Sequence, residues 1–432
     1  MRRVVITGLG CFTPAGGVER SWQTVLLGKS WIKKNTKCDC SFFKSKIASF
    51  VDINDSLIEK NLDKISIREK KRMDDVSYIA ILSTYDALKD AKMICEDAKI
   101  NENKKIEIDA KIDKMRFGTF IGSGFGGIKT GQNEINSFFR KGNNKISPLF
   151  LPSYLLNMAS GNVAIKFDLF GANISNVSAC ATSSHSIGEA FNYIRTGRLD
   201  YCVAGGSEVA VCETIIAGFD SMNALSSKYN EEPNKASRPL DKNRDGFVIG
   251  EGGAVLILEE LESAKRRGAK IYCEIVGYGA SCDAYHITSP EPNGLGASRA
   301  INNAINDANI SINDINYINL HGTSTNIGDI AEIKAIKNTF GEYYKNICIS
   351  STKSTTGHLL GSAGAIEAIF CAKTIAEQII PPSINIDNLD DCCENMNIIQ
   401  EKTKSDVNFT LSNSFGFGGT NGCLIFKKYI VD

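Results

Sequence analysis

The cysteine of greatest chemical interest lies where an apolar stretch gives way to small residues, Asn176-Val-Ser-Ala-Cys-Ala-Thr-Ser-Ser184. This pattern predicts a tight strand-to-helix turn, with Cys180 at the start of the helix. The positive end of the helix dipole favours the thiolate, which is the nucleophilic form of cysteine. The segment alone leaves open that Cys180 is one more buried thiol.

Two further segments lie at or after the ends of apolar strands, and each contains a histidine. Leu320-His-Gly-Thr-Ser-Thr325 contains His321, and Ser351-Thr-Lys-Ser-Thr-Thr-Gly-His358 contains Lys353 and His358. Strand ends of α/β sheets face the crevice in which ligands bind, so we expect both imidazoles in a site. An N-capping cluster with an incidental histidine remains the alternative for the first segment. A phosphate loop is disfavoured for the second, because Gly-x₄-Gly-Lys-Ser/Thr is absent.

The fourth segment is rich in glycine, Asn413-Ser-Phe-Gly-Phe-Gly-Gly-Thr-Asn-Gly422. Glycines let backbone N–H groups converge, which an oxyanion hole requires. Phe415 and Phe417 among the glycines could form an apolar gate. A plain β-turn is the alternative.

Together the four segments closely resemble the signatures of elongating β-ketoacyl-acyl-carrier-protein synthases. The resemblance runs from Arg3 to the C-terminus and is interrupted mainly by a charged stretch at 101–114. It implies an α/β, thiolase-like fold with two similar α/β halves in a five-layer αβαβα arrangement, usually a homodimer. We expect the halves to span 1–262, with the cysteine, and 263–432, with the histidines, lysine and Gly-rich loop.

The resemblance also implies a role for each of the central residues. Cys180 would accept the acyl chain, and the backbone N–H groups of Cys180 and Phe417 would form the oxyanion hole. His321 and His358 would stabilise an enolate oxygen, and Lys353 would organise the site electrostatically without acting as a nucleophile. Neutral imidazoles suffice for this role.

The surrounding roles are implied in the same way. Glu367 would orient Lys353 or His358, unless it is an ordinary surface glutamate. A bulky residue at position 125 could restrict acyl chain length. Thr323 and Thr325 would bind the pantetheine, and Phe415 and Phe417 would form the gate. Phe219 and Phe125 would line the acyl pocket, unless they are ordinary core aromatics.

The implied reaction is the elongation of acyl-ACP by malonyl-ACP (ACP, acyl carrier protein) through decarboxylative Claisen condensation in type II fatty acid synthesis. No cofactor is expected beyond the phosphopantetheine of the carrier, which is the expected partner. A polyketide ketosynthase and a cysteine thioester hydrolase remain alternatives. Three related classes are disfavoured. A degradative thiolase would use a second cysteine, and an initiating synthase would have Asn at position 358. A non-catalytic subunit would lack the nucleophile.

Composition narrows the class of partner. The 49 basic and 49 acidic residues cancel, so no global field attracts nucleic acid. No apolar run approaches the ~20 residues that span a bilayer. The 14 cysteines include no Cys-x-x-Cys, and no metal site is expected. We expect a soluble protein of a bacterial cytoplasm, or of a plastid stroma after removal of a transit peptide.

Two motif matches are expected to mislead. Gly122–Gly127 fits Gly-x-Gly-x-x-Gly but lacks the acidic residue about 20 positions further on that a dinucleotide site needs. Asp241–Gly246 opens like a calcium loop, but position 12 is Gly252 rather than glutamate. Both are interpreted as structural turns.

Strands and helices alternate along the chain, which predicts a mixed, mostly parallel sheet in each half. The helix over 74–92 has the clearest helical period. The stretch 97–114 is predicted to be a solvated insertion, with a charged surface helix as the alternative. Strands are predicted at 4–7, 116–122, 171–178, 201–205, 253–259, 271–280, 315–321, 347–351, 406–412 and 422–427, and further helices at 21–28, 179–196, 260–268, 297–308, 329–340 and 362–377.

Overall fold

The computed structural model describes residues 1–141 and 146–430, and its principal strands form one continuous sheet of eleven strands. Four very short strands pair separately, β2 (Lys33–Lys34) with β3 (Ile47–Ala48) and β11 (Ile379–Ile380) with β13 (Thr403–Lys404). The order across the main sheet is β12 (Asn397–Ile398), β10 (Cys348–Ser350), β9 (Tyr317–Asn319), β14 (Phe409–Gly416), β15 (Thr420–Lys427), β8 (Cys273–Cys282), β1 (Val4–Phe12), β7 (Gly252–Glu260), β6 (Tyr201–Glu208), β4 (Phe117–Gly122) and β5 (Asn173–Ile174).

The strand order repeats outward from the centre of the sheet. From β1 outward, β7 and β6 follow in antiparallel pairing, and β4 and β5 continue in parallel. From β8 outward, β15 and β14 are antiparallel, and β9 and β10 are parallel. Two similar halves are thus confirmed, but the mostly parallel sheet is wrong: pairing is parallel only toward the two outer edges. The Gly-rich turn after Gly416 makes β14 and β15 a hairpin, which is antiparallel of necessity.

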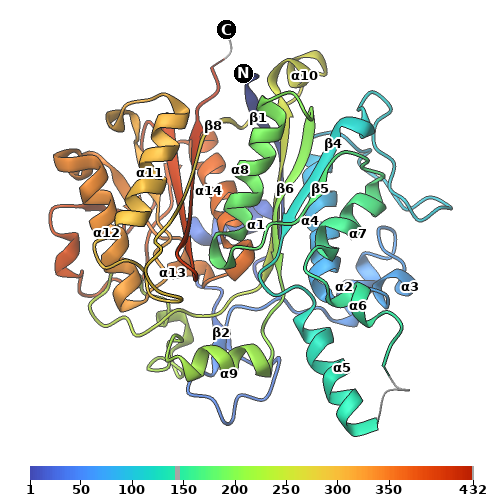
Figure 1. Ribbon diagram of the computed structural model, residues 1–432, viewed down its shortest axis with the longest axis horizontal. Helices are drawn as coiled ribbons and strands as arrows, with labels where there is room; N and C mark the ends of the chain where they lie inside the picture. Colours follow the sequence, from blue (N-terminus) through green and yellow to red (C-terminus); the bar gives the residue numbers. More distant parts are fainter. Residues whose placement is uncertain (142–145, 431–432) are drawn as a thin grey trace.

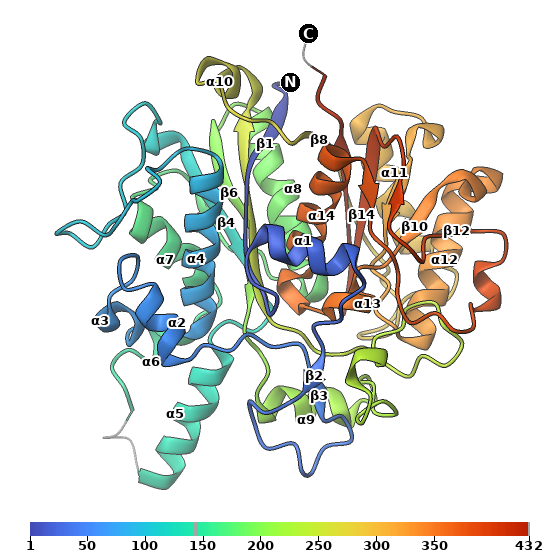
Figure 2. The same ribbon diagram turned by 180° about the vertical axis from the view of Figure 1, so that it is seen from behind.

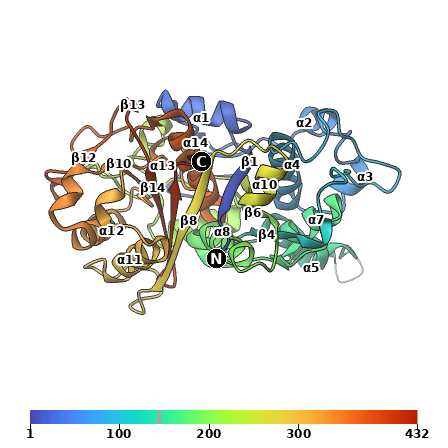
Figure 3. The ribbon, with the colours of Figure 1, turned by 90° about the horizontal axis from the view of Figure 1, so that it is seen from above.

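Helices pack on both faces of the curved sheet and also form a central layer between the strands of its two halves (Figure 1). The central pair is α8 (Thr182–Arg195) and α14 (Ala363–Glu377), which pack against each other between the strands of the two halves, as Figure 3 shows from above. The outer layers are formed by α4 (Asp75–Asp90) with α7 (Met158–Phe167), and by α11 (Leu295–Ala308) with α12 (Asn326–Phe340). This is the five-layer αβαβα arrangement that the resemblance implied.

Equivalent glycines let one outer helix in each half approach the central strands. A Cβ on Gly10 of β1 would lie 2.0 Å from the backbone carbonyl oxygen of Ser83 in α4. A Cβ on Gly279 of β8 would lie 2.1 Å from the Ala300 oxygen in α11. The same close helix-on-strand contact is therefore built twice, which strengthens the correspondence between the halves.

Some predicted elements are shorter than expected. Of the strand predicted at 171–178 only β5 forms, because the chain leaves the sheet edge to enter the cysteine turn. The helix predicted from 179 begins with a single 3₁₀ turn, Ala179–Ala181, before α8. The stretch 97–114 is irregular, with neither a strand nor an α-helix, and Ile106, Ile108 and Ile112 are buried against the core around α4, so it is more than a solvated insertion.

The other helices lie around this frame (Figure 2). No helix in the described ranges is long and apolar enough to cross a membrane. The remaining α-helices are α1 (Val18–Leu26), α2 (Asp55–Lys60), α3 (Ile67–Lys70), α5 (Ile128–Lys141), α6 (Phe150–Tyr154), α9 (Glu213–Ser221), α10 (Leu261–Arg266) and α13 (Lys353–Thr356).

Candidate active site

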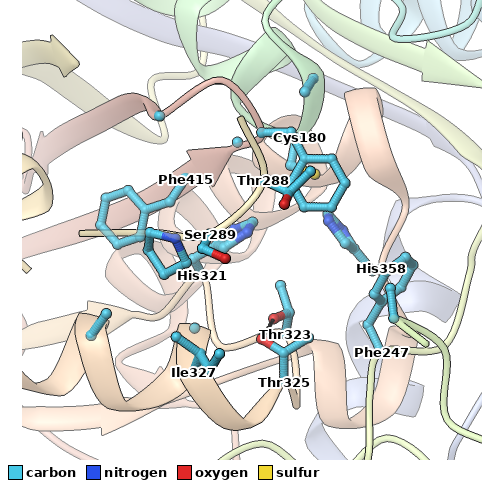
Figure 4. Close-up of a pocket in the computed structure, with 18 of the residues that line it drawn as sticks. Cys180, Phe247, Thr288, Ser289, His321, Thr323, Thr325, Ile327, His358 and Phe415 are labelled. Atoms are coloured by element: carbon cyan, nitrogen blue, oxygen red, sulfur yellow. Dashed lines mark hydrogen bonds between the residues drawn. The ribbon is translucent and has the colours of Figure 1, made fainter. Parts of the chain in front are cut away.

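A cavity of about 680 Å³ lies where the strand ends of the two halves meet. Segments far apart in the sequence supply its walls, and Figure 4 shows His321 and His358 pointing toward Cys180. Of the residues singled out in the sequence, those that line it are Cys180, His321, His358, Thr323, Thr325, Phe125, Phe219, Phe415 and Phe417. The lining is mostly apolar, as expected of a site that takes an acyl chain.

Cys180 lies in the 3₁₀ turn that precedes α8, and the turn is tight because Ala179 adopts a left-handed conformation with φ of 49°. The thiol is desolvated, which raises the pKa of Cys180 to about 12; the Lys353 charge opposes this rise. Burial therefore acts against the helix terminus, which favours the thiolate, and a proton must leave the sulfur when it attacks.

The two histidines stand beside this thiol. One nitrogen of His321, one of His358 and the Cys180 sulfur all lie within 4.8 Å of one another. Burial, joined by the charge of Lys353, holds the pKa of both imidazoles well below 6.5, so both are neutral. The expectation that neutral imidazoles would serve here agrees with these directions.

A backbone contact fixes the tautomer of His358. The Leu360 N–H donates to Nδ1 of His358 at 3.3 Å, so the proton of the neutral ring is on Nε2. Nε2 is buried and has no partner within the described residues. The Nε2–H of His358 is therefore an unsatisfied hydrogen-bond donor in the site. Cysteine and histidine are also zinc ligands, but this protonated nitrogen has no free lone pair and suits a negatively charged oxygen better than a cation.

Lys353 and Glu367 lie behind the cavity wall, each about 1% exposed, and form a buried ion pair. Burial raises the pKa of Glu367 to about 7, and the partner lysine opposes the rise. Glu367 is therefore not a surface residue, and it contacts Lys353 rather than His358. The charge of Lys353 acts on the sulfur and on both imidazoles.

Sequence reasoning missed a buried glutamate that shapes the His321 loop. Glu332, on α12, accepts the backbone N–H groups of His321 at 2.8 Å and Gly322 at 2.7 Å, and the Asn413 amide at 3.0 Å. Burial raises the pKa of Glu332 to about 7, against the effect of these donors. One carboxylate thus ties the His321 loop to β14.

A second missed glutamate explains the Gly-rich turn at 122–127. Glu208 accepts the N–H groups of Gly124 at 2.7 Å, Phe125 at 3.2 Å and Gly361 at 3.1 Å. The backbone donors that would bind a phosphate in a dinucleotide site are thus used by the protein's own carboxylate. The interpretation of this motif as a structural turn agrees with these contacts.

The calcium-like segment is likewise structural. Asp241 accepts from the Arg238 guanidinium at 3.0 Å and from the Asn243 and Asp387 backbone N–H groups. Asp245 accepts from the hydroxyl of Ser226 and two following N–H groups. Both carboxylates accept hydrogen bonds from protein donors, whereas a cation site needs carboxylate oxygens that are free to coordinate the ion.

Aromatic rings surround the reaction centre. Phe219 contacts Phe125, Phe247 and Phe417, with ring centroids 6.2, 5.1 and 6.4 Å away. Phe415 packs edge-on against His321 at 5.8 Å. Phe247, which also packs on His358, was not anticipated.

Hydroxyl groups line another part of the cavity. The Oγ1 atoms of Thr323 and Thr325 are 3.0 Å apart. Thr288 and Ser289, which sequence reasoning missed, also line it (Figure 4). No motif distinguishes these two residues, because they lie in an irregular segment without a predicted element.

Comparisons with known proteins agree with this geometry. Residues 1–264 match the model of the β-ketoacyl synthase N-terminal domain, and residues 272–387 that of the C-terminal domain. The chain is 43% identical over 429 residues to 3-oxoacyl-acyl-carrier-protein synthase 2 of Staphylococcus aureus, covering 99% of both chains, and equally so to that of Coxiella burnetii.

Solved structures show the same fold over the full length. A β-ketoacyl synthase from Burkholderia phymatum is 32% identical, with a TM-score of 0.87 and complete coverage of both chains. A type II polyketide ketosynthase, solved with its acyl-carrier protein and bound to a hexaketide, is 32% identical with a TM-score of 0.86, covering 99% of this chain and 100% of that one.

Proposed function

Because the chain belongs to the β-ketoacyl synthase family, we propose that it elongates acyl-ACP with malonyl-ACP by decarboxylative Claisen condensation in type II fatty acid synthesis. The observation that carries this proposal is the convergence of the Cys180 sulfur with one nitrogen each of His321 and His358, within 4.8 Å. A thiol can hold an acyl group, and two neutral imidazoles can stabilise an enolate.

In the first half-reaction Cys180 attacks the thioester carbonyl of acyl-ACP. The sulfur loses its proton, the new C–S bond forms, and the pantetheine thiol leaves with a proton. The N–H groups of Cys180 and Phe417 are the proposed oxyanion hole. Its support is that Gly416 packs against the turn so closely that a Cβ there would lie 3.2 Å from the Cys180 nitrogen.

In the second half-reaction malonyl-ACP loses carbon dioxide. The electrons of the broken C–C bond form an enolate, whose oxygen accepts hydrogen bonds from His358 and His321. The carbanion then attacks the acyl carbon on Cys180, and the C–S bond breaks to release β-ketoacyl-ACP. Lys353, held by Glu367, supplies positive charge to this centre. The substrate provides the electron pair, so the chemistry calls for no further cofactor.

The substrate contacts follow from the cavity lining. Thr323 and Thr325 are proposed to bind the pantetheine amides, and Phe415 and Phe417 to gate the two half-reactions. Phe219 and Phe125 are proposed to bound the acyl pocket. The carrier protein is the proposed partner, since one structural relative was solved with its own.

The division into halves stays a proposal, at 1–262 and 263–432, between β7 and β8. The compartment proposed is a bacterial cytoplasm or a plastid stroma, the two in which free-standing synthases of this kind would work. The relatives with 43% identity are bacterial.

A polyketide ketosynthase is the second candidate, because one structural relative binds a hexaketide. The identity of 43% to 3-oxoacyl-acyl-carrier-protein synthase 2, against 32% to the polyketide ketosynthase, favours fatty acid elongation. A cysteine thioester hydrolase would not need two neutral imidazoles beside the thiol.

The test is to treat the protein with a medium-chain acyl-ACP and then malonyl-ACP, following products by mass spectrometry. We expect an acyl adduct on Cys180 and then β-ketoacyl-ACP two carbons longer. Cys180→Ala should form no adduct yet still decarboxylate malonyl-ACP. Acylation without condensation, with several carriers, would defeat the proposal and the roles of His321 and His358.

A further inference from the structure

A third histidine joins the cysteine turn to the neighbouring hairpin. His185, in the first turns of α8, has Nδ1 2.7 Å from the Ser178 hydroxyl and Nε2 3.2 Å from the Asn421 carbonyl oxygen. A carbonyl oxygen only accepts, so Nε2 carries the proton and Nδ1 accepts from Ser178. Burial lowers the pKa of His185, which keeps the ring in this neutral form. The imidazole is therefore a bridge with a defined donor end and acceptor end.

At one end the bridge holds the residue that sets the direction of the turn. Ser178 lies two residues before Cys180, and its N–H donates to Thr182 Oγ1 at 2.9 Å. Its carbonyl accepts from Thr420 Oγ1 at 3.1 Å. With the bond to His185, all the polar groups of Ser178 are used. They hold the left-handed backbone of Ala179, which a non-glycine residue adopts only under constraint.

At the other end the bridge reaches β15, directly opposite the gate. Asn421 pairs across the hairpin with Phe415, and its amide donates to Asp283 at 2.8 Å. The next residue, Gly422, makes room for the ring, since a Cβ there would lie 2.9 Å from the His185 Cδ2. The hairpin is thus shaped to receive the imidazole.

We propose that His185 is a positioning residue for the acyl-transfer half-reaction. It keeps the turn at 178–180 and the β14–β15 hairpin at a fixed offset, so that the N–H groups of Cys180 and Phe417 face the same oxygen. This inference rests on the proposed function, because those two donors are its oxyanion hole. The donors come from separate segments, so the hole exists only while both segments are held together.

Acylation and alkylation of Cys180 separate positioning from simple stability. Acyl transfer from acyl-ACP builds an oxyanion, whereas iodoacetamide alkylates the thiol without one. His185→Phe keeps a ring but loses both hydrogen bonds, and we expect its single-turnover acylation rate to fall about 30-fold while alkylation stays within about twofold. His185→Gln, which can still donate to Asn421, should recover part of the loss. Ser186→Ala removes a neighbouring hydroxyl on α8 and should leave both rates unchanged.

The link to Ser178 is tested by combination. Ser178→Ala should lower acylation, and adding it to His185→Phe should cause no further loss, because both remove the same bridge. Unchanged acylation in His185→Phe would overturn the inference, and so would an equal fall in acylation and alkylation, which would mean that the thiol itself had moved. Failure of the wild-type protein to condense would instead defeat the proposed function.

Discussion

The two imidazoles beside Cys180 differ from ordinary histidines in their protonation. Burial and the nearby Lys353 charge lower the pKa of His321 and His358 well below 6.5. In the unfolded chain both would take up protons near pH 6.5, while the folded protein would not. Stability from this pair is therefore present above that pH and is lost as the pH falls below it.

The protonation can be observed directly, since the chain has only four histidines. In ¹⁵N-histidine NMR we expect the signals of His321 and His358 to remain those of neutral rings when the pH falls well below 6.5. His321→Asn and His358→Asn variants assign the two signals. Titration of either ring near 6.5 would contradict the proposed burial and its consequence.

Phe125 gives a prediction on chain length. It faces the cavity and packs edge-on against Phe219. Phe125→Ile should deepen the acyl pocket, and each extra pair of buried methylenes should then raise kcat/KM about tenfold for the longer chain. Competition between acyl-ACPs of different chain length measures this preference.

The control is Phe43→Leu, because Phe43 belongs to the same apolar cluster without lining the cavity. An unchanged chain-length preference in Phe125→Ile would show that Phe125 does not bound the acyl pocket.

Among elements, α12 fixes the His321 loop through one carboxylate. Glu332→Ala would leave the buried N–H groups of His321 and Gly322 without their acceptor. We expect the free energy of unfolding to fall by about 2–4 kcal/mol, together with slower malonyl-ACP decarboxylation. Urea unfolding and carbon dioxide release measure the two effects.

An exposed glutamate provides the matched control. Glu342 pairs with Lys345 at the surface, and Glu342→Ala should change the unfolding free energy by less than about 0.5 kcal/mol. If Glu332→Ala were equally mild, the carboxylate would not be what holds the loop.

The motifs predicted which loops meet, but not what holds them. Cys180, His321 and His358 lie in compact segments with recognisable spacing. Glu208 accepts backbone N–H groups of segments distant in the chain, and Glu332 joins the nearby His321 loop to the side-chain amide of the distant Asn413. A glutamate within a strand or helix carries no mark of such partners. Local sequence therefore indicated the site, and only the fold revealed its supports.

The same contrast holds for elements. The helix predicted over 74–92 matches α4 nearly to the residue, and α4 begins at a side-chain cap, Asp74. In contrast, α7 and α9 begin without a side-chain cap and have no counterpart among the predicted helices. The sequence also carries one signal of the repeated halves. Gly-x-Gly occurs in β1 at 8–10 and in β8 at 277–279, where a helix presses on each strand.

At the scale of the whole molecule, α5 and α6 carry exposed apolar side chains. Phe139 is 80% exposed, and Ile135, Phe138 and Leu151 are also exposed. A monomer rarely leaves such a group uncovered, which supports the expected homodimer. Phe139→Glu should shift the protein toward monomer in light scattering coupled to size-exclusion chromatography. The control is Phe42→Glu, because Phe42 is 90% exposed but lies outside α5 and α6. A monomeric wild-type protein, or a dimer that persists in Phe139→Glu, would contradict the proposal that α5 and α6 form the dimer interface.

Strand β1 precedes every other strand of the main sheet in the described sequence, yet it lies at the centre of that sheet, between β7 and β8. Its partners are residues 252–282, so at a translation rate of 5–20 residues per second it waits roughly 10–50 s for them. During that interval both edges of a nearly all-buried strand lack their hydrogen-bond partners. We therefore expect nascent chains stalled before Gly252 to expose an unpaired, apolar strand, to which a chaperone would bind.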